Sequence, residues 1–168
     1  RRPPRSTHCI SSAASDVYKR QGVSINNLSL NENDIGDFRT FLKLSPPLRT
    51  EEDRIALVQG LKDETIDVIV SDHKPEDEEQ KRLTFAQAST GASGIETLLS
   101  LSLELYHNGS VKLQTIIKAL TSSPAKILKI NKGNLSVGNE ADFCIVDIDK
   151  PWVCLLYTSD AADDMQCV

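Results

Sequence analysis

The stretch Ile66-Asp67-Val68-Ile69-Val70-Ser71-Asp72-His73-Lys74-Pro75 decides the fold class of this chain. Its β-branched apolar run is too short and too rich in Ile and Val for a helix, and it is typical of a buried parallel strand. Because Pro75 cannot continue a strand, Asp72 is expected at the carboxyl end of one. In α/β folds that edge is where substrates bind and react. Asp72 is therefore the candidate catalytic and metal-binding carboxylate, and an aspartate that merely caps a loop or helix is the alternative.

The segments before this strand predict a parallel β–α–β unit. The apolar segments 22–25 and 38–44 are predicted strands. A helix is expected after Thr50, whose hydroxyl can cap it, with Asp53 as a weaker capping-box partner three residues on. A strand, a helix and a second strand joined by short loops form such a unit.

The residues after Pro75 are predicted to form loops, helices and two last strands. The charged run 76–82 is interpreted as a solvated loop. Helices are expected at 95–107, 111–120 and 123–128. Short strands are expected at 135–138 and 142–148, with Cys144 as a small buried hydrophobic residue.

Three side chains are assigned structural roles. Arg49 is expected to pair with Glu52 or Asp53 at the start of the helix that follows it. His107 is expected to interact with carbonyl groups at the end of its helix. His73 is expected to be a supporting loop residue, because successive side chains of a strand point to opposite faces.

Residues 1–21 and 154–168 look foreign to the protein. The sequences 11–21 and 154–164 can be encoded by opposite strands of one DNA segment, as expected of translated adaptor DNA, and such ends are excluded from fold reasoning. The native region is then about 22–153, and Cys144 is its single cysteine. A disulfide framework or a cysteine-based zinc site is excluded within that region.

The chain is acidic, with 24 Asp and Glu against 19 Lys and Arg and a net charge of −5. That balance argues against nucleic acid as a partner and fits a cytoplasmic protein. No apolar run approaches the roughly 20 residues that cross a membrane, so no membrane partner is expected.

Five motifs in order resemble the dihydroorotases of the amidohydrolase superfamily, over nearly all of the native region. Residues 24–28 resemble Thr-Pro-His-His-Leu of that family, and residues 43–49 resemble Lys-Met-Asn-Pro-Pro-Leu-Arg. Residues 71–76 resemble Thr-Asp-His-Ala-Pro-His, and residues 91–97 resemble Gly-x-x-Gly-x-Glu-Thr. Residues 133–147 resemble the closing signature of many amidohydrolases, where the chain joins a small β-sandwich.

The resemblance implies an α/β fold: the C-terminal part, about strands six to eight, of a metal-dependent (β/α)8 barrel, with short strands of a composite β-sandwich. Strands six, seven and eight would be residues 22–26, 40–44 and 66–71, within a barrel part at 22–130 and a sandwich part at 131–153. In the family, one or two metal ions, usually zinc, lie at the strand ends. Since strands one to five would be missing, the chain alone is expected to lack a complete zinc site and hydrolase activity.

The resemblance also implies roles for single residues. Asp72 matches an aspartate that binds metal and shuttles a proton from a bridging hydroxide to the leaving amide nitrogen. Asn26 matches a strand-six metal ligand that is His in active relatives, and an amide oxygen is a poor substitute for imidazole toward zinc. Ser45 and Glu76 match an Asn and a His that contact the substrate, and Gly91 is assigned to the same substrate site.

Three functions remain open at this point. The first is a working dihydroorotase, which closes carbamoyl aspartate to dihydroorotate in pyrimidine synthesis; the retained Asp72 favours it. The second is a non-catalytic dihydroorotase-like subunit that supports aspartate transcarbamoylase; the changes at Asn26, Ser45 and Glu76 favour it. The third is another cyclic amidohydrolase, such as a hydantoinase or an allantoinase, against which the loop 46–49 argues.

Overall fold

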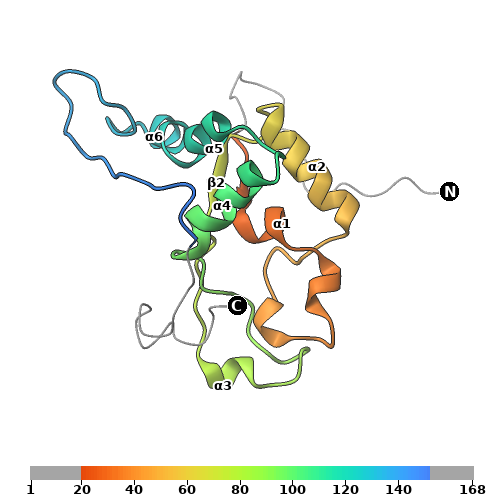
Figure 1. The fold of residues 1–168 in the computed structure, drawn as a ribbon. Helices are drawn as coiled ribbons and strands as arrows, with labels where there is room; N and C mark the ends of the chain where they lie inside the picture. The colour runs from red at the N-terminus through yellow and green to blue at the C-terminus, as the bar shows by residue number, and fades with distance from the viewer. Residues whose placement is uncertain (1–19, 152–168) are drawn as a thin grey trace, which may run out of the picture.

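The structure is a computed structural model in which residues 20–151 are described (Figure 1). The predicted foreign ends lie outside these residues, apart from Arg20 and Gln21. The elements in chain order are β1 (Gly22–Ser24), α1 (Ile25–Ser29), the 3-10 helices η1 (Glu32–Ile35) and η2 (Thr40–Leu42), α2 (Glu51–Lys62), β2 (Val68–Val70), α3 (Glu78–Lys81), α4 (Thr97–His107), α5 (Leu113–Leu120) and α6 (Ser122–Leu128).

A parallel β–α–β unit is present, but its first strand is β1 and not the predicted strand at 38–44. Strands β1 and β2 pair in parallel, with Val23 opposite Ile69 and Ser24 opposite Val70, and α2 lies between them in the chain. Helix α2 begins as expected, since the Thr50 hydroxyl accepts a hydrogen bond from the Asp53 amide at 3.2 Å. The β-branched run and the cap therefore act locally, as the sequence indicates.

The core lies where α1, α2, α4 and α5 meet the two strands (Figure 1). Ile25, Leu28 and Ile116 are fully buried, and Leu61 of α2 is 1% exposed. Burying such a side chain contributes about 1.5–3 kcal/mol. The helices predicted at 95–107, 111–120 and 123–128 are confirmed as α4, α5 and α6, with starts that differ by two residues or fewer.

The strand predicted at 38–44 is wrong. Residues 40–42 form the 3-10 helix η2, and Phe38 is largely exposed. The place beside β2 is taken by β1, which pairs with it directly. The numbering of β1 as strand six of a barrel stays a prediction.

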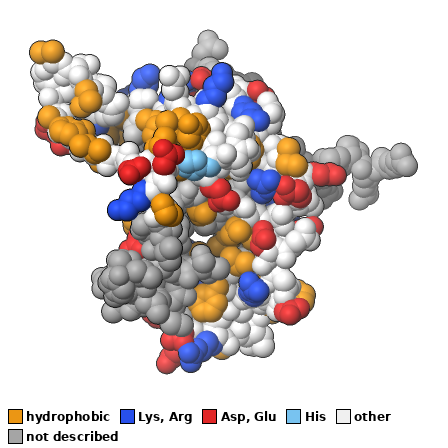
Figure 2. Space-filling view, viewed as in Figure 1, with side chains coloured by type: hydrophobic (Ala, Val, Ile, Leu, Met, Phe, Trp, Pro, Cys, Tyr) orange, Lys and Arg blue, Asp and Glu red, His pale blue; other side chains and the backbone are white. Residues whose placement is uncertain are grey.

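The strands predicted at 135–138 and 142–148 are also wrong. No strand forms among residues 131–151, and Val137 and Ile145 are almost completely exposed. Cys144 is exposed rather than buried. The segment leaves α6 as a long loop and returns toward α4 (Figure 1), and apolar side chains show on the loop in Figure 2. A strand needs a ladder partner, and no described residue supplies one here.

Two smaller interpretations also change. The charged run 76–82 contains the short helix α3, and its Lys81 is buried. The Nε2 atom of His107 lies 2.9 Å from the Ile148 carbonyl oxygen rather than at a carbonyl of its own helix. The predicted pairing of Arg49 is confirmed, with its Nε 3.4 Å from a carboxylate oxygen of Asp53. None of the helices in residues 20–151 has the length and apolar character of a membrane span.

Candidate functional site at the carboxyl end of strand β2

Three of the sequence motifs meet just beyond the carboxyl end of β2. His73 and Ala92 form an isolated parallel bridge, and the Lys74 amide donates to the Ala92 carbonyl at 2.8 Å. The Gly91 amide donates to the Lys43 carbonyl at 3.0 Å. The segments 43–49, 71–76 and 91–97 are therefore joined through their backbones at the edge where α/β folds place their chemistry.

Two glycines allow this close approach. A Cβ atom on Gly91 would lie 2.3 Å from the Lys74 carbonyl oxygen, and the φ of Gly91 is +146°. A Cβ atom on Gly94 would lie 2.4 Å from the Ser71 carbonyl oxygen. Only glycine fits where two backbones come so near. The structure thus explains why residue 91 is glycine, and its contact with a substrate stays a prediction.

Asp72 occupies the predicted position, two residues past the last paired residue of β2, and its side chain is partly exposed. Its φ is +52°, in the left-handed region that few residues other than glycine adopt, although Asp is among those that tolerate it. Backbone conformations of this kind cluster at functional sites. The neighbouring His73 supports the turn, because its Nδ1 accepts a hydrogen bond from the Gly94 amide at 3.2 Å.

A cavity of about 250 Å³ lies beside this turn. Its walls come from α1, η1 and η2 on one side and from the segment 92–101 on the other. The lining residues are Asn26, Ser29, Leu30, Asp34, Arg39, Phe41, Leu42, Ala92, Ser93, Thr97 and Leu101. Asn26 is 7% exposed, and within the described residues its Nδ2 atom has no hydrogen-bond partner. The Oγ atom of Ser29 is likewise buried without a partner there. Asn26 and Ser29 thus contribute to the cavity wall side chains whose polar atoms are buried and lack a partner within the described residues.

The other predicted site residues do not line this cavity. Ser45 is exposed. Glu76 forms an ion pair with Lys74, with its Oε1 3.2 Å from the Lys74 Nζ. That pair offsets the negative charge of Glu76, and the contact of Glu76 with a substrate stays a prediction. The structure therefore joins Asn26 to the 92–101 segment and leaves Asp72, Ser45 and Glu76 on the neighbouring loops.

The described residues do not fit a complete zinc site. Within 20–151 no three His, Cys, Asp or Glu side chains are grouped closely enough to hold a metal ion. A zinc site takes three or four protein ligands, and Asp72 and Asn26 would supply at most two. Asn26 directly follows β1, which pairs with β2, and its role as a metal ligand stays a prediction.

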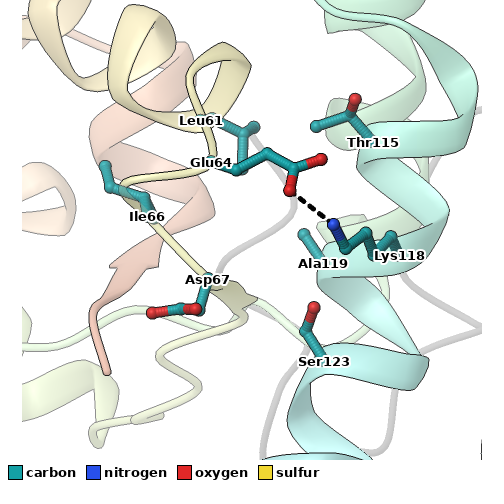
Figure 3. Close-up of a pocket in the computed structure, with 8 residues that line it drawn as sticks. All are labelled: Leu61, Glu64, Ile66, Asp67, Thr115, Lys118, Ala119 and Ser123. Atoms are coloured by element: carbon teal, nitrogen blue, oxygen red, sulfur yellow. Dashed lines mark hydrogen bonds and ion pairs between the residues drawn. The ribbon is translucent and has the colours of Figure 1, made fainter. Parts of the chain in front are cut away.

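A second, smaller pocket lies near the other end of β2 (Figure 3). It measures about 40 Å³ and lies between the α2–β2 connection and α5, where Lys118 pairs with Glu64 at 2.6 Å. Asp67, at the amino-terminal side of β2, pairs with Arg20 at 3.0 Å. None of the predicted site residues lines this pocket, so the carboxyl end of β2 is the candidate site.

Sequence reasoning missed Lys81, which is completely buried beside the 89–91 loop. Nothing in the charged run distinguishes it from its neighbours, because six of the seven residues from 76 to 82 carry charge. Burial lowers the pKa of its ammonium group, and the nearby carboxylate of Glu76 opposes that effect. A buried cation next to a candidate cavity is a feature that only the fold reveals.

Residues 8–166 match the model of the amidohydrolase family. The chain belongs to this family. It is 41% identical over 140 residues to a dihydroorotase of Ehrlichia canis (strain Jake), covering 80% of the chain and 31% of that relative. It is 42% identical over 130 residues to a dihydroorotase of Wolbachia sp. subsp. Drosophila simulans (strain wRi), covering 77% of the chain and 30% of that relative.

Solved structures of a hydantoinase and of a dihydropyrimidinase share the fold of this chain. An L-hydantoinase from Arthrobacter aurescens superposes with a TM-score of 0.67 at 31% identity, covering 73% of the chain and 29% of that protein. A dihydropyrimidinase from Brevibacillus agri NCHU1002 gives a TM-score of 0.67 at 25% identity, with the same coverage. The amidohydrolase chain thus spans about a third of the length of the relatives that it matches.

The comparisons confirm the resemblance to dihydroorotases. They also indicate a superfamily with the (β/α)8 barrel fold, and the structure contains only part of such a barrel. The composite β-sandwich stays a prediction. The family match also runs beyond residues 22 and 153, and the foreign origin of the two ends stays a prediction as well. Amidohydrolases are generally metal-dependent, and zinc stays a prediction for this chain.

Proposed function

We propose that the protein containing this chain is a dihydroorotase, a cyclic amidohydrolase that interconverts dihydroorotate and carbamoyl aspartate in pyrimidine biosynthesis. The observation that carries the proposal is the backbone junction between the Asp72 motif and the Gly91 motif at the carboxyl end of β2. Relatives named dihydroorotase at 41–42% identity support this substrate over other cyclic amides.

In the proposed reaction, Asp72 is the acid–base residue. Water adds to the ring carbonyl carbon of dihydroorotate, and the Asp72 carboxylate takes a proton from it. When the carbon–nitrogen bond breaks, Asp72 returns that proton to the leaving nitrogen, which gives carbamoyl aspartate. Ser45, Glu76 and Gly91 are proposed substrate contacts. Zinc is the proposed metal, and because the described residues hold too few ligands for it, this chain alone is expected to be inactive.

The test uses the full-length product of the gene that encodes this chain, assayed with dihydroorotate, hydantoin and dihydrouracil, with zinc measured by mass spectrometry in the same sample. Dihydroorotate is expected to be the best substrate. Asp72→Asn is expected to lower kcat by roughly 10²–10⁴-fold, the usual contribution of an acid–base residue. Asp67→Asn is the matched control, because Asp67 lies at the opposite end of β2 from the candidate site.

Two outcomes would replace the proposal. Faster turnover of hydantoin than of dihydroorotate would indicate a different cyclic amidohydrolase, in line with the hydantoinase structures that share the fold. Absence of both zinc and turnover would favour the non-catalytic subunit, which the names of the sequence relatives do not favour. Binding of the purified protein to aspartate transcarbamoylase would then be measured.

A further inference from the structure

Lys81 is a charged side chain with no exposure to solvent. It lies at the end of α3, where it forms no ion pair with a carboxylate among residues 20–151. Removing an ammonium group from water costs several kcal/mol unless the protein replaces its hydration. The residue therefore needs compensating partners, and their identity shows what it does.

Three backbone carbonyl groups replace that hydration. The Lys81 Nζ donates to the oxygen of Thr40 at 3.3 Å, to that of Ser89 at 3.1 Å and to that of Gly91. An ammonium group has three hydrogens, so each hydrogen has an acceptor. The Thr40 hydroxyl in turn donates to the Lys81 carbonyl oxygen. The side chain thus joins η2 to the loop before α4.

Both of these segments continue directly into the walls of the 250 Å³ cavity. Thr40 is followed by Phe41 and Leu42, which line one wall. Gly91 is followed by Ala92 and Ser93, which line the facing wall. The ammonium group of Lys81 therefore hydrogen-bonds to the residue immediately before each wall, which is Thr40 on one side and Gly91 on the other.

We propose that Lys81 is a positioning residue, which fixes the separation of η2 and the Gly91–Gly94 loop and so shapes the cavity for a small cyclic amide. The choice of ligand rests on the proposed function, whereas the positioning of the two walls does not. Charge-assisted hydrogen bonds from the ammonium to carbonyl oxygens supply the rigidity.

The first test is steady-state kinetics on the full-length protein with dihydroorotate. Lys81→Met keeps the unbranched stem and removes the ammonium, and it is expected to raise KM about tenfold with kcat within about twofold, as for loss of charged hydrogen bonds. Lys126→Met, on the exposed surface of α6, is expected to change neither constant. A fall in kcat at unchanged KM would indicate only a smaller folded fraction and would overturn the proposal.

The second test does not depend on activity. Hydrogen exchange of the 168-residue chain is compared for wild type and Lys81→Met. The Gly91 amide, which donates to the Lys43 carbonyl, is expected to exchange about tenfold faster, and the amides of α2 at an unchanged rate. Equal exchange at Gly91, or uniform acceleration that includes α2, would overturn the role of Lys81. If wild type has no dihydroorotase activity but the loop responds in this way, the proposed function fails and the positioning role stands.

Discussion

Two irregular segments of this amidohydrolase chain, 84–94 and 131–151, differ sharply in how they are held. Neither contains a helix or a strand. In the first, Ala88, Gly91 and Gly94 are buried, and the carbonyl groups accept hydrogen bonds from lysines of neighbouring elements. In the second, Val137 and Ile145 are almost fully exposed.

The difference lies in where the hydrogen-bond partners come from. Lys43 donates to the carbonyls of Ala86 and Ala88, at 3.1 and 2.7 Å, and it belongs to a segment far from them in sequence. In 131–151 the ion pairs are local, between Lys132 and the carboxylates of Glu140 and Asp142, and the contact with a packed helix is that of the Ile148 carbonyl with His107 of α4. Irregular backbone is positioned when packed elements satisfy its polar groups, and local pairs on an exposed segment do not achieve this.

The largest effect on stability is expected from a pair of isoleucine substitutions. The pair tests whether the apolar side chains of 131–151 stay outside the packed core in solution. Ile116→Ala in the core is expected to destabilise the chain by about 3 kcal/mol, through lost burial and a cavity. Ile145→Ala is expected to change stability by less than about 0.5 kcal/mol, as for most surface substitutions. Urea unfolding followed by circular dichroism measures both. Similar losses of unfolding free energy for the two variants would mean that 131–151 packs against the rest of the chain in solution. The contrast between the two segments would then be wrong.

A glycine pair gives the next largest effect. Gly91→Ala is expected to cost about 2 to 3 kcal/mol, because its Cβ would meet the Lys74 carbonyl and its φ is positive. Gly138→Ala has a positive φ of +93° but open space around the new Cβ, so about 1 kcal/mol or less is expected. The same unfolding assay measures both variants. The difference between them is the cost of the clash with the Lys74 carbonyl, because both positions share a positive φ. Equal costs at the two positions would show that the close approach at Gly91 is absent in solution.

The smallest effect concerns pH and an ion pair in the packed part of the chain. Hydrogen bonds from Arg54 and Asn31 lower the pKa of Glu51 from 4.5 to about 2. Because the folded pKa is the lower one, this stabilisation is fully present above pH 4.5 and is lost as pH falls toward 2. Wild type is therefore expected to exceed Glu51→Gln in unfolding midpoint at pH 6, with the difference shrinking between pH 4.5 and 2. A difference that does not change with pH would mean that the carboxylate charge contributes nothing.

The candidate site was predictable from sequence only in part. The position of Asp72 at the end of a strand follows from the apolar run and from Pro75, both of which act within a few residues. The meeting of that motif with Gly91 follows from the family resemblance. The strand order does not follow, because the apolar residues 38–44 carry the same local signal as a strand and only the direct pairing of β1 with β2 excludes them from the sheet.

The sequence by itself determined the β-branched strand before Asp72, the Thr50 cap and the three later helices, because each depends on neighbours along the chain. Only the tertiary structure decided that Lys81 is buried and that 131–151 forms no ladder. The fate of a charged or apolar side chain outside a periodic element depends on partners that are distant in sequence. For Lys81 those partners are the carbonyls of Thr40, Ser89 and Gly91, which are brought together only when η2, α3 and the loop before α4 pack.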